Sequence, residues 1–201
     1  MSATGPRLEF WYEFASTYSY LSAMRIEALA EAAGVAVAWK PFLLGPIFHA
    51  QGWNTSPFNL YPAKGRNMVR DIERVAAERG LGFALPTGFP QNSLVAARLA
   101  LVGGDESWIA PFTRAVYLTE FDAGADIADR TVLETVLESL HLDSERLFSR
   151  VEQADIKERL KRQTAQAQAR GVFGAPSFLV GEELFWGDDR LEQALAWAGR
   201  G

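Results

Sequence analysis

Near its start the chain has an apolar stretch in which hydrophobic and polar residues show little alternation. Residues 7–14 read Arg-Leu-Glu-Phe-Trp-Tyr-Glu-Phe, which is too continuous for a surface strand, so we predict a strand buried on both faces. A helical pattern then runs from about 17 to 33, where Gly34 is placed to end the helix. Residues 35–40 predict a second strand. This β-α-β opening indicates a parallel strand pair with a right-handed crossover.

A segment without helical period follows the second strand. Residues 41–65 are rich in Pro, Gly and Asn, and we predict one long loop. Long loops inside compact domains are usually functional or disordered. The aromatic residues Phe48, Trp53, Phe58 and Tyr61 argue against disorder.

Residues 66–170 predict helices only. Apolar positions recur there at helical spacing, and Asp and Gly residues stand where helices would begin and end. The expected boundaries are an end near Gly80, an end at Gly103 and Gly104, N-caps at Asp105, Asp129 and Asp143, and a long polar helix at 154–169.

The last quarter of the chain returns to strands. Residues 177–186 predict a β-hairpin with its turn at Glu182 and Glu183, and residues 187–189 open a final helix. The element order is therefore β-α-β, a helical block, then β-β-α. This order predicts the α/β class, with a thioredoxin-like scaffold that carries a large all-helical insertion after its second strand.

The same order divides the chain into two parts. We predict a thioredoxin-like domain made of residues 1–45 and 171–201. We predict a helical insertion domain at 46–170, which includes the long loop and the connecting helix. No internal repeat is visible.

Composition and charge narrow the classes of partner. The 201 residues are 48% hydrophobic, which is enough for a substantial core. The net charge of −5 offers no basic field for nucleic acid or an anionic membrane. No apolar run approaches the roughly 20 residues that span a bilayer, and the segment 1–7 lacks the apolar core of a signal peptide. We expect a soluble, cytoplasmic protein with neither nucleic acid nor membrane as a partner.

Cysteine and histidine usage excludes several chemistries. The chain has no cysteine, which rules out disulfides, thiolate metal sites and catalysis by a thiol of its own. His49 and His141 are far apart and lack metal-ligand spacing. We expect neither a metal site nor a histidine-centred catalytic triad.

Ser16 lies in the turn between the first predicted strand and the first predicted helix, at the N-terminus of that helix. At that point, unpaired backbone N–H groups and the positive end of the helix dipole favour an anion. Ser16 or Thr17 also suits the ordinary role of N-cap. The residues alone leave both interpretations open, a cap or a site for an anion or thiolate.

Four motifs together point to a known family. They are Ala-Ser-Thr-Tyr-Ser-Tyr-Leu at 15–21, Lys-Pro-Phe-Leu-Leu-Gly at 40–45, Gly-Val-Phe-Gly-Ala-Pro at 171–176 and Phe-Trp-Gly-Asp-Asp-Arg-Leu at 185–191. Over nearly the whole chain the sequence resembles the 2-hydroxychromene-2-carboxylate isomerases and their relatives, the kappa-class glutathione transferases. The resemblance also implies a homodimer.

The resemblance implies a glutathione site around Ser16. This residue matches the serine that replaces the nucleophilic cysteine of redox relatives and holds the sulfur of glutathione. The family commonly has proline where this chain has Thr17, which leaves open which hydroxyl meets the thiol. Ala175 matches the residue whose backbone pairs with the cysteinyl unit, and Pro176 matches a proline that is cis in thioredoxin-like folds.

Two acidic residues complete the implied glutathione site. Asp188 and Asp189 match the polar pair that holds the γ-glutamyl end at the start of the last helix. Plain N-capping of that helix is the alternative, and one helix end can serve both roles.

The second substrate is expected between the sheet and the helical block. Candidate lining residues are Phe48, Trp53, Asn54, Phe58, Asn59 and Phe89. Aromatic clusters often belong to a core, but a place in irregular loops favours a pocket. Lys64 and Arg74 are candidates to hold a substrate carboxylate or the glutathione, although a lone lysine is commonly solvated.

The implied activity is a glutathione-dependent cis–trans isomerisation. Its substrate would be 2-hydroxychromene-2-carboxylate or a related aromatic conjugated keto acid. A glutathione thiolate, favoured by Ser16, can add to a conjugated alkene, allow rotation and leave again. The alternatives are a kappa-type glutathione transferase or peroxidase, and a non-catalytic thioredoxin-like binding module.

Overall fold

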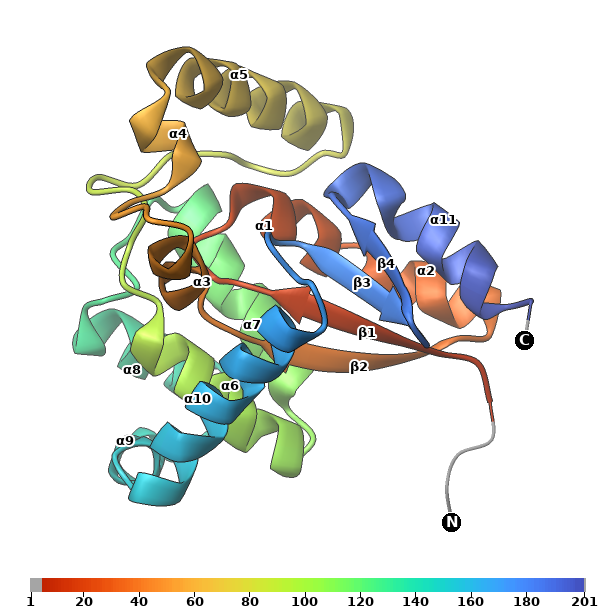
Figure 1. The fold of residues 1–201 in the computed structure, drawn as a ribbon. Coiled ribbons are helices and arrows are strands. Elements are labelled where there is room, and N and C mark those ends of the chain that lie inside the picture. Colours follow the sequence, from red (N-terminus) through yellow and green to blue (C-terminus); the bar gives the residue numbers. More distant parts are fainter. Residues whose placement is uncertain (1–4, 201) are drawn as a thin grey trace.

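The strands of the protein form one mixed sheet within residues 5–200, the part that the computed structural model describes (Figure 1). β1 (Arg7–Tyr12) pairs in parallel with β2 (Ala36–Pro41) and antiparallel with β3 (Ser177–Val180), which pairs antiparallel with β4 (Glu183–Trp186). The predicted β-α-β opening, the C-terminal hairpin and the α/β class are confirmed. Residues 1–4, part of the segment predicted to lack a signal peptide, lie outside this description, as does residue 201.

β1 is buried on both faces, as its sequence predicts. Leu8, Phe10 and Tyr12 are fully buried in one hydrophobic cluster, whereas Trp11 is fully buried in a second cluster on the opposite face. This follows from the two-residue period of a strand. The strand ends at Tyr12, two residues before the predicted end, because the chain turns at Glu13.

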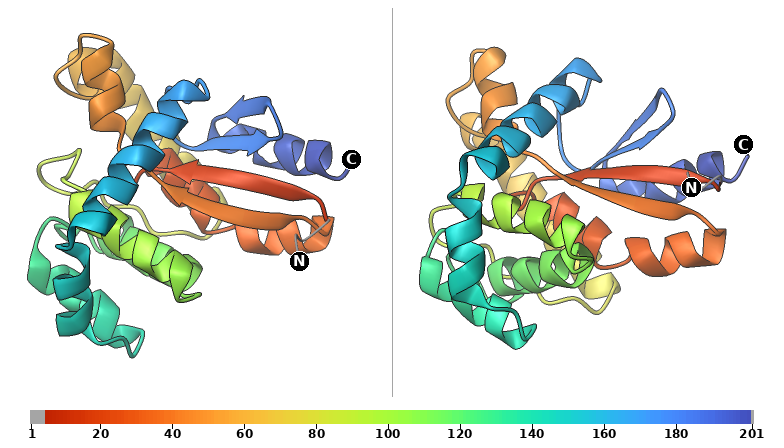
Figure 2. Two further views of the ribbon diagram at one scale, coloured as in Figure 1. Left: turned by 60° about the horizontal axis from the view of Figure 1, so that its bottom comes forward. Right: turned by 90° about the horizontal axis from the view of Figure 1, so that it is seen from below.

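Helices cover both faces of the sheet. Figure 2 shows helices on either side of the strands. The cluster of Phe10 includes residues of α1, α2, α5–α9, α10 and α11, and the cluster of Trp11 includes residues of α3 and α10. The helices are α1 (Thr17–Ala23), α2 (Ile26–Ala33), α3 (Leu44–Ala50), α4 (Pro57–Leu60), α5 (Pro62–Glu78), α6 (Leu94–Asp105), α7 (Ile109–Tyr117), α8 (Arg130–Ser139), α9 (Ser144–Val151), α10 (Ala154–Ala169) and α11 (Leu191–Ala198), with a π-helical turn η1 (Leu118–Asp122) and a 3-10 turn η2 (Asp188–Arg190).

The first cluster runs from the thioredoxin-like part into the helical block without interruption. The division at 46–170 therefore stays a prediction about folding units. None of the helices in residues 5–200 is both long and apolar enough to cross a membrane.

The predicted loop at 41–65 is mostly helical, and that prediction was wrong. The segment holds α3, α4 and the first residues of α5. Pro57 and Pro62 stand in the first turns of α4 and α5, where a missing N–H removes no intrahelical hydrogen bond. Both prolines stand at the start of a helix, whereas the prediction treated the prolines of this segment as signs of a loop.

The predicted helix at 17–33 is two helices. α1 ends at Ala23 and α2 begins at Ile26. At the break, the Arg25 guanidinium reaches the C-terminal segment and donates to the backbone carbonyl of Asp188 at 2.7 Å. The break between α1 and α2 therefore coincides with a contact to a distant segment, which the local hydrophobic pattern does not reveal.

α6 continues through the two glycines that were expected to end it. It ends at Asp105, so Asp105 is not the N-cap of the next helix, whose N-cap is Trp108. The other two caps are confirmed, because Asp129 accepts a hydrogen bond from Thr131 N–H and Asp143 accepts one from Arg146 N–H. The hairpin turn lies at 181–182, one residue earlier than predicted.

Gly103 and Gly104 offer a stability test within one helix. A Cβ at Gly103 would lie 2.6 Å from Trp108 Cε3, whereas a Cβ at Gly104 would meet only Ile109 Cδ1 at 3.6 Å. We expect Gly103→Ala to destabilise the fold by about 1–3 kcal/mol through overpacking. Gly104→Ala should be neutral or stabilise it by up to about 1 kcal/mol. Urea unfolding of both variants measures the difference, and equal effects would contradict this packing argument.

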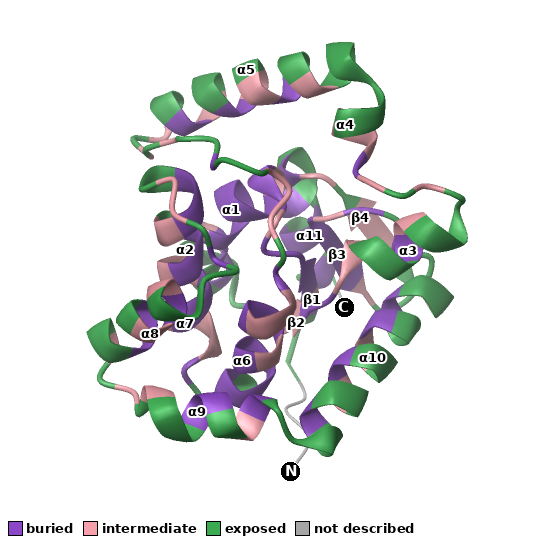
Figure 3. Ribbon diagram, turned by 90° about the vertical axis from the view of Figure 1, so that its left-hand side faces the viewer, coloured by how far each residue is buried: buried purple, intermediate pink, exposed green. Residues whose placement is uncertain are grey.

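α5 lies over α1 with one buried edge. Met68, Ile72 and Ala76 are buried on that edge, and most of the opposite side is exposed (Figure 3). α4 and α5 thereby form an overhang above the point where β1 meets α1. The space beneath this overhang holds the candidate site.

Candidate active site

A large cavity opens at the junction of β1 and α1. Its volume is about 1740 Å³, and it is bordered by the α3–α4 segment, α5, the loop at 88–94 and the start of β3. We call it the site cavity. Of the polar and backbone residues predicted for glutathione and the second substrate, all but Arg74 line it, together with Phe89, namely Ser16, Asn54, Asn59, Lys64, Phe89, Ala175, Pro176, Asp188 and Asp189.

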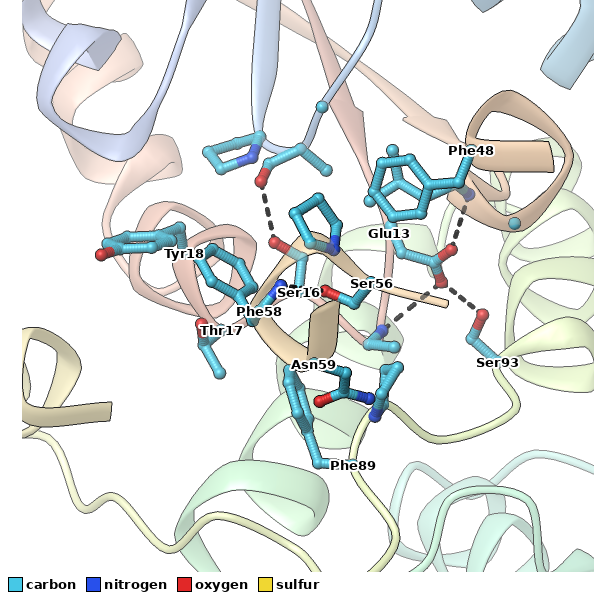
Figure 4. Close-up of a pocket in the computed structure, with 18 of the residues that line it drawn as sticks. Glu13, Ser16, Thr17, Tyr18, Phe48, Ser56, Phe58, Asn59, Phe89 and Ser93 are labelled. Atoms are coloured by element: carbon cyan, nitrogen blue, oxygen red, sulfur yellow. Dashed lines mark hydrogen bonds between the residues drawn. The ribbon is translucent and has the colours of Figure 1, made fainter. Parts of the chain in front are cut away.

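Ser16 joins the start of α1 to the loop before β3. Its Oγ accepts a hydrogen bond from Ser19 N–H at 3.2 Å, which confirms it as the N-cap of α1. The same hydroxyl donates to the carbonyl oxygen of Ala175 at 2.9 Å (Figure 4). The Ala175–Pro176 peptide bond is cis. Ser16 therefore both caps α1 and lines the site cavity. A thiolate bound beside it would compete with the Ala175 carbonyl oxygen for the hydrogen bond that the Ser16 hydroxyl donates.

Thr17 directs its hydroxyl away from Ser16. Its Oγ1 donates to Met68 Sδ at 3.3 Å, between α1 and α5, and the residue is 1% exposed. Of the two neighbouring hydroxyl groups, the one on Ser16 faces the cis-proline loop.

Asp188 is buried and already paired. Its carboxylate accepts hydrogen bonds from Ser22 Oγ at 2.8 Å and from the guanidiniums of Arg79 at 2.7 Å and Arg25 at 3.3 Å. Neither Asp188 nor Asp189 caps α11, whose N-cap is Arg190 because η2 intervenes. The capping alternative is therefore wrong. Asp189 is exposed, so its charge is the more available of the two for an ammonium group.

Arg79 is a cavity residue that sequence reasoning missed. It lines the site cavity beside Asp188, and its buried Nη1 has no hydrogen-bond partner within residues 5–200. A buried N–H donor without an acceptor is costly unless a ligand supplies one. A carboxylate suits a guanidinium best, and glutathione carries two. The donors present thus fit that tripeptide at this end of the cavity.

The polar candidates for the second substrate line the cavity from the α3–α4 segment, α4 and the start of α5. Asn54, Asn59 and Lys64 are exposed, and Lys64 Nζ lies 5.1 Å from the ring centre of Tyr61. Arg74 does not line the cavity. Its guanidinium is paired with Asp71 of the same helix at 3.2 Å, so its predicted role is not supported by its position.

The aromatic candidates form part of the wall as well. Phe48, Trp53, Phe58 and Phe89 line the site cavity and are half-buried. Phe48 and Trp53 lie against each other with ring centres 5.7 Å apart. These side chains give the cavity an apolar side that suits an aromatic ligand.

Glu13 is a second residue that sequence reasoning missed. It lines the site cavity at 6% exposure, and its carboxylate accepts hydrogen bonds from the Ser93 hydroxyl, Leu44 N–H and Ala15 N–H (Figure 4). Burial raises the pKa of Glu13, and these hydrogen bonds lower it by less. The signal in the sequence was an acidic residue inside an otherwise aromatic run, directly before the turn to Ser16.

Comparisons with known proteins agree with this geometry. The DSBA-like thioredoxin domain matches residues 7–196. The chain is 30% identical to a 2-hydroxychromene-2-carboxylate isomerase of Sphingobium xenophagum over 92% of this chain and 94% of that protein. It is 25% identical to glutathione s-transferase kappa 2 of Caenorhabditis elegans over 92% and 88% of the two chains.

A solved structure extends the agreement to three dimensions. The selenomethionine form of a 2-hydroxychromene-2-carboxylate isomerase superposes with a TM-score of 0.86 at 27% identity, covering 96% of this chain and 95% of that one. Both the sheet and the helical block are therefore shared. The chain belongs to the DSBA-like thioredoxin domain family and, within it, to the family of the 2-hydroxychromene-2-carboxylate isomerases.

Proposed function

We propose that the protein is a glutathione-dependent cis–trans isomerase of 2-hydroxychromene-2-carboxylate or a related aromatic conjugated keto acid. The observation that carries the proposal is the 2.9 Å hydrogen bond from Ser16 Oγ to the carbonyl of Ala175 at the cavity wall. It sets a hydroxyl donor beside a cis-proline loop in a chain without cysteine. Aromatic side chains face the same space.

The residues around Ser16 have distinct tasks in this proposal. Bound glutathione supplies a thiolate that adds reversibly to a conjugated alkene. Ser16 donates a hydrogen bond to the sulfur and so lowers the free energy of its charged form. Ala175 offers backbone groups to the tripeptide, and Arg79 Nη1 donates to one of its carboxylates.

The second substrate binds against the aromatic residues of the site cavity and Lys64. Phe48, Phe58 and Phe89 provide apolar surface for its ring. Lys64 provides a positive charge for its carboxylate. The large cavity volume agrees with two ligands held side by side rather than one.

Glutathione titration followed by thermal unfolding tests the proposal. A ligand that binds only the folded state at 100 times its Kd adds about 2.7 kcal/mol of stability. For a chain of this size the melting temperature should rise by roughly 5–11 °C. Cysteinylglycine, which lacks the γ-glutamyl group, is the control ligand and should raise it much less. No rise with millimolar glutathione would contradict the proposal.

A kappa-type glutathione transferase or peroxidase is the second candidate. The relative in Caenorhabditis elegans, which carries the kappa transferase name, favours it. Incubating the protein with 2-hydroxychromene-2-carboxylate and glutathione separates the two activities. An isomerase regenerates glutathione at every turnover, whereas a transferase consumes it in proportion to product. A non-catalytic thioredoxin-like binding module, the third alternative, would show no rise in melting temperature with glutathione and no turnover.

Two further expectations belong to the same proposal. The family resemblance implies a homodimer, which light scattering behind a sizing column measures. A cytoplasmic location is also expected, where reduced glutathione is abundant enough to serve as a cofactor.

A further inference from the structure

Glu13 occupies an unusual position for a buried acid. Within residues 5–200 no basic side chain forms an ion pair with it, in contrast to Asp188, which is held by two arginines. Its partners are one hydroxyl and backbone N–H groups. It precedes Ser16 by three residues and lines the same cavity. A carboxyl group therefore lines the same cavity as the Ser16 hydroxyl, with no ion-pair partner in the described part of the chain.

The hydrogen bonds of Glu13 leave one position open. Oε1 accepts from the Ser93 hydroxyl and from Ala15 N–H, whereas Oε2 accepts only from Leu44 N–H at 2.9 Å. A carboxylate offers about four acceptor positions. The unused position on Oε2 is where a protonated Glu13 would carry its hydrogen.

The reaction proposed above needs a proton donor in this part of the cavity. When a thiolate adds to the alkene carbon β to a ketone, negative charge develops on the ketone oxygen. An ionised carboxylate nearby would oppose that charge, whereas a neutral carboxylic acid stabilises it by donating a hydrogen bond or a proton. Neither the Ser16 hydroxyl, committed to the sulfur, nor Lys64, assigned to the substrate carboxylate, is free for this task.

We propose that Glu13 is a catalytic proton donor, whose Oε2 hydrogen goes to the ketone oxygen of the conjugated keto acid. This inference rests on the isomerase function proposed above. In the forward step a C–S bond forms at the β carbon, and the alkene π pair becomes the second bond between the α carbon and the ketone carbon. The C=O π pair takes the proton from Glu13, so that C=O becomes C–O–H as the Glu13 O–H bond breaks. After rotation about the former double bond the proton returns to Glu13 and the C–S bond breaks.

The burial of Glu13 favours its neutral form. Burial raises its pKa and also raises the pKa values of Tyr117 and Glu120, which lie on the side of α7 and η1, well above their ordinary values. The other titratable groups that line the site cavity are Tyr18 in α1, His49 in α3, Lys64 and Asp71 in α5, Arg79 directly after α5, and Asp188 and Asp189 in η2.

The proposal predicts a fall in turnover at high pH. Activity should rise as the thiolate forms and fall as pH passes through the raised pKa of Glu13, because the donor is then lost. Glu13→Gln should lower kcat by about 10²-fold, a typical contribution of general acid catalysis, and abolish the alkaline fall. Ser93→Ala keeps the carboxyl group but removes a donor that favours its charged form, so the alkaline fall should move to higher pH.

A readout without glutathione accompanies the kinetics. Because the pKa of Glu13 is raised in the folded protein, wild-type stability is full below the ordinary carboxyl pKa and declines as pH rises toward the folded value. Glu13→Gln should lack the part of this decline that Glu13 contributes, whereas the part contributed by Glu120 remains, so the melting temperature of the variant relative to wild type should increase across that pH range. Glu120→Gln is the matched control, since Glu120 is a buried acid that does not line the site cavity. It should leave the pH profile of turnover unchanged.

The outcomes separate the two proposals. If Glu13 serves only to cap α3 through Leu44 N–H, Glu13→Gln should lower the melting temperature and leave the alkaline fall in turnover unaltered. This result would overturn the proton-donor role. An unmoved alkaline fall in Ser93→Ala also counts against it if Glu13→Gln does not fold. If wild type turns over and only the Glu13 expectations fail, the isomerase function stands. If glutathione supports no turnover, both proposals fall.

Discussion

Ser16→Ala is expected to lower kcat with glutathione by about 10²–10³-fold, the usual cost of removing one donor that stabilises developing or bound negative charge. The variant should still fold. Losing the N-cap bond to Ser19 N–H costs about 1 kcal/mol, or roughly 2–4 °C in melting temperature. Steady-state kinetics on 2-hydroxychromene-2-carboxylate together with thermal unfolding measure both effects.

Two variants control for the structural part of this loss. Asp129→Ala removes the N-cap of α8, which does not line the site cavity, and should cost similar stability with unchanged turnover. Thr17→Val removes the hydroxyl that donates to Met68, so it should retain most activity. Full turnover in Ser16→Ala, or a loss in Thr17→Val as large as in Ser16→Ala, would refute the role given to Ser16.

Asp188→Asn is expected to destabilise the protein by about 3 kcal/mol. The substitution removes the negative charge that Arg25 and Arg79 share at a carboxylate whose side chain is only 6% exposed. Breaking a buried pair on one side leaves uncompensated charge, which costs about 3–5 kcal/mol, and the partial exposure of the two arginines places this pair at the lower end of that range. The melting temperature should fall by roughly 6–12 °C.

The neighbouring residue is the matched control. The side chain of Asp189 is 74% exposed and lies 3.6 Å from Arg190, so Asp189→Asn should leave the melting temperature nearly unchanged. If Asp189 contacts the γ-glutamyl ammonium group, the same variant should weaken glutathione binding. Equal destabilisation by the two substitutions would show that the Asp188 cluster does not hold the start of α11 in place.

Where sequence reasoning about the fold worked, the deciding interactions were local. The two-residue period of β1 reported correctly that both faces are buried. Asp129 and Asp143 cap their helices through N–H groups two and three residues away, so the signal and the contact lie in one short segment. Element order then restricted the connections to a few, and the predicted topology was correct.

The fold predictions that failed depended on distant residues or on an ambiguous residue type. Gly103 reads as a helix end, but the Trp108 ring fills the space beside it and α6 continues. Pro57 and Pro62 read as breakers, although proline also suits the first turn of a helix. For each of these residues, the position that it takes within a helix decides whether it ends the helix, begins it or lies inside it.

The candidate site divides in the same way. Sequence motifs identified Ser16, Ala175 and Pro176, and the structure brings them together. The partners of Asp188, and the cavity positions of Arg79 and Glu13, come from segments far apart in the chain. A single sequence carries no information on which of its many charged residues meet.

The sequence by itself determined the order of strands and helical regions along the chain and the serine that caps α1, because hydrophobic periodicity and capping act within a few residues. Only the tertiary structure decided which acids are neutralised and which face the cavity. Charge state and burial depend on groups brought together across the whole fold, and these set the chemistry that each carboxyl group can perform.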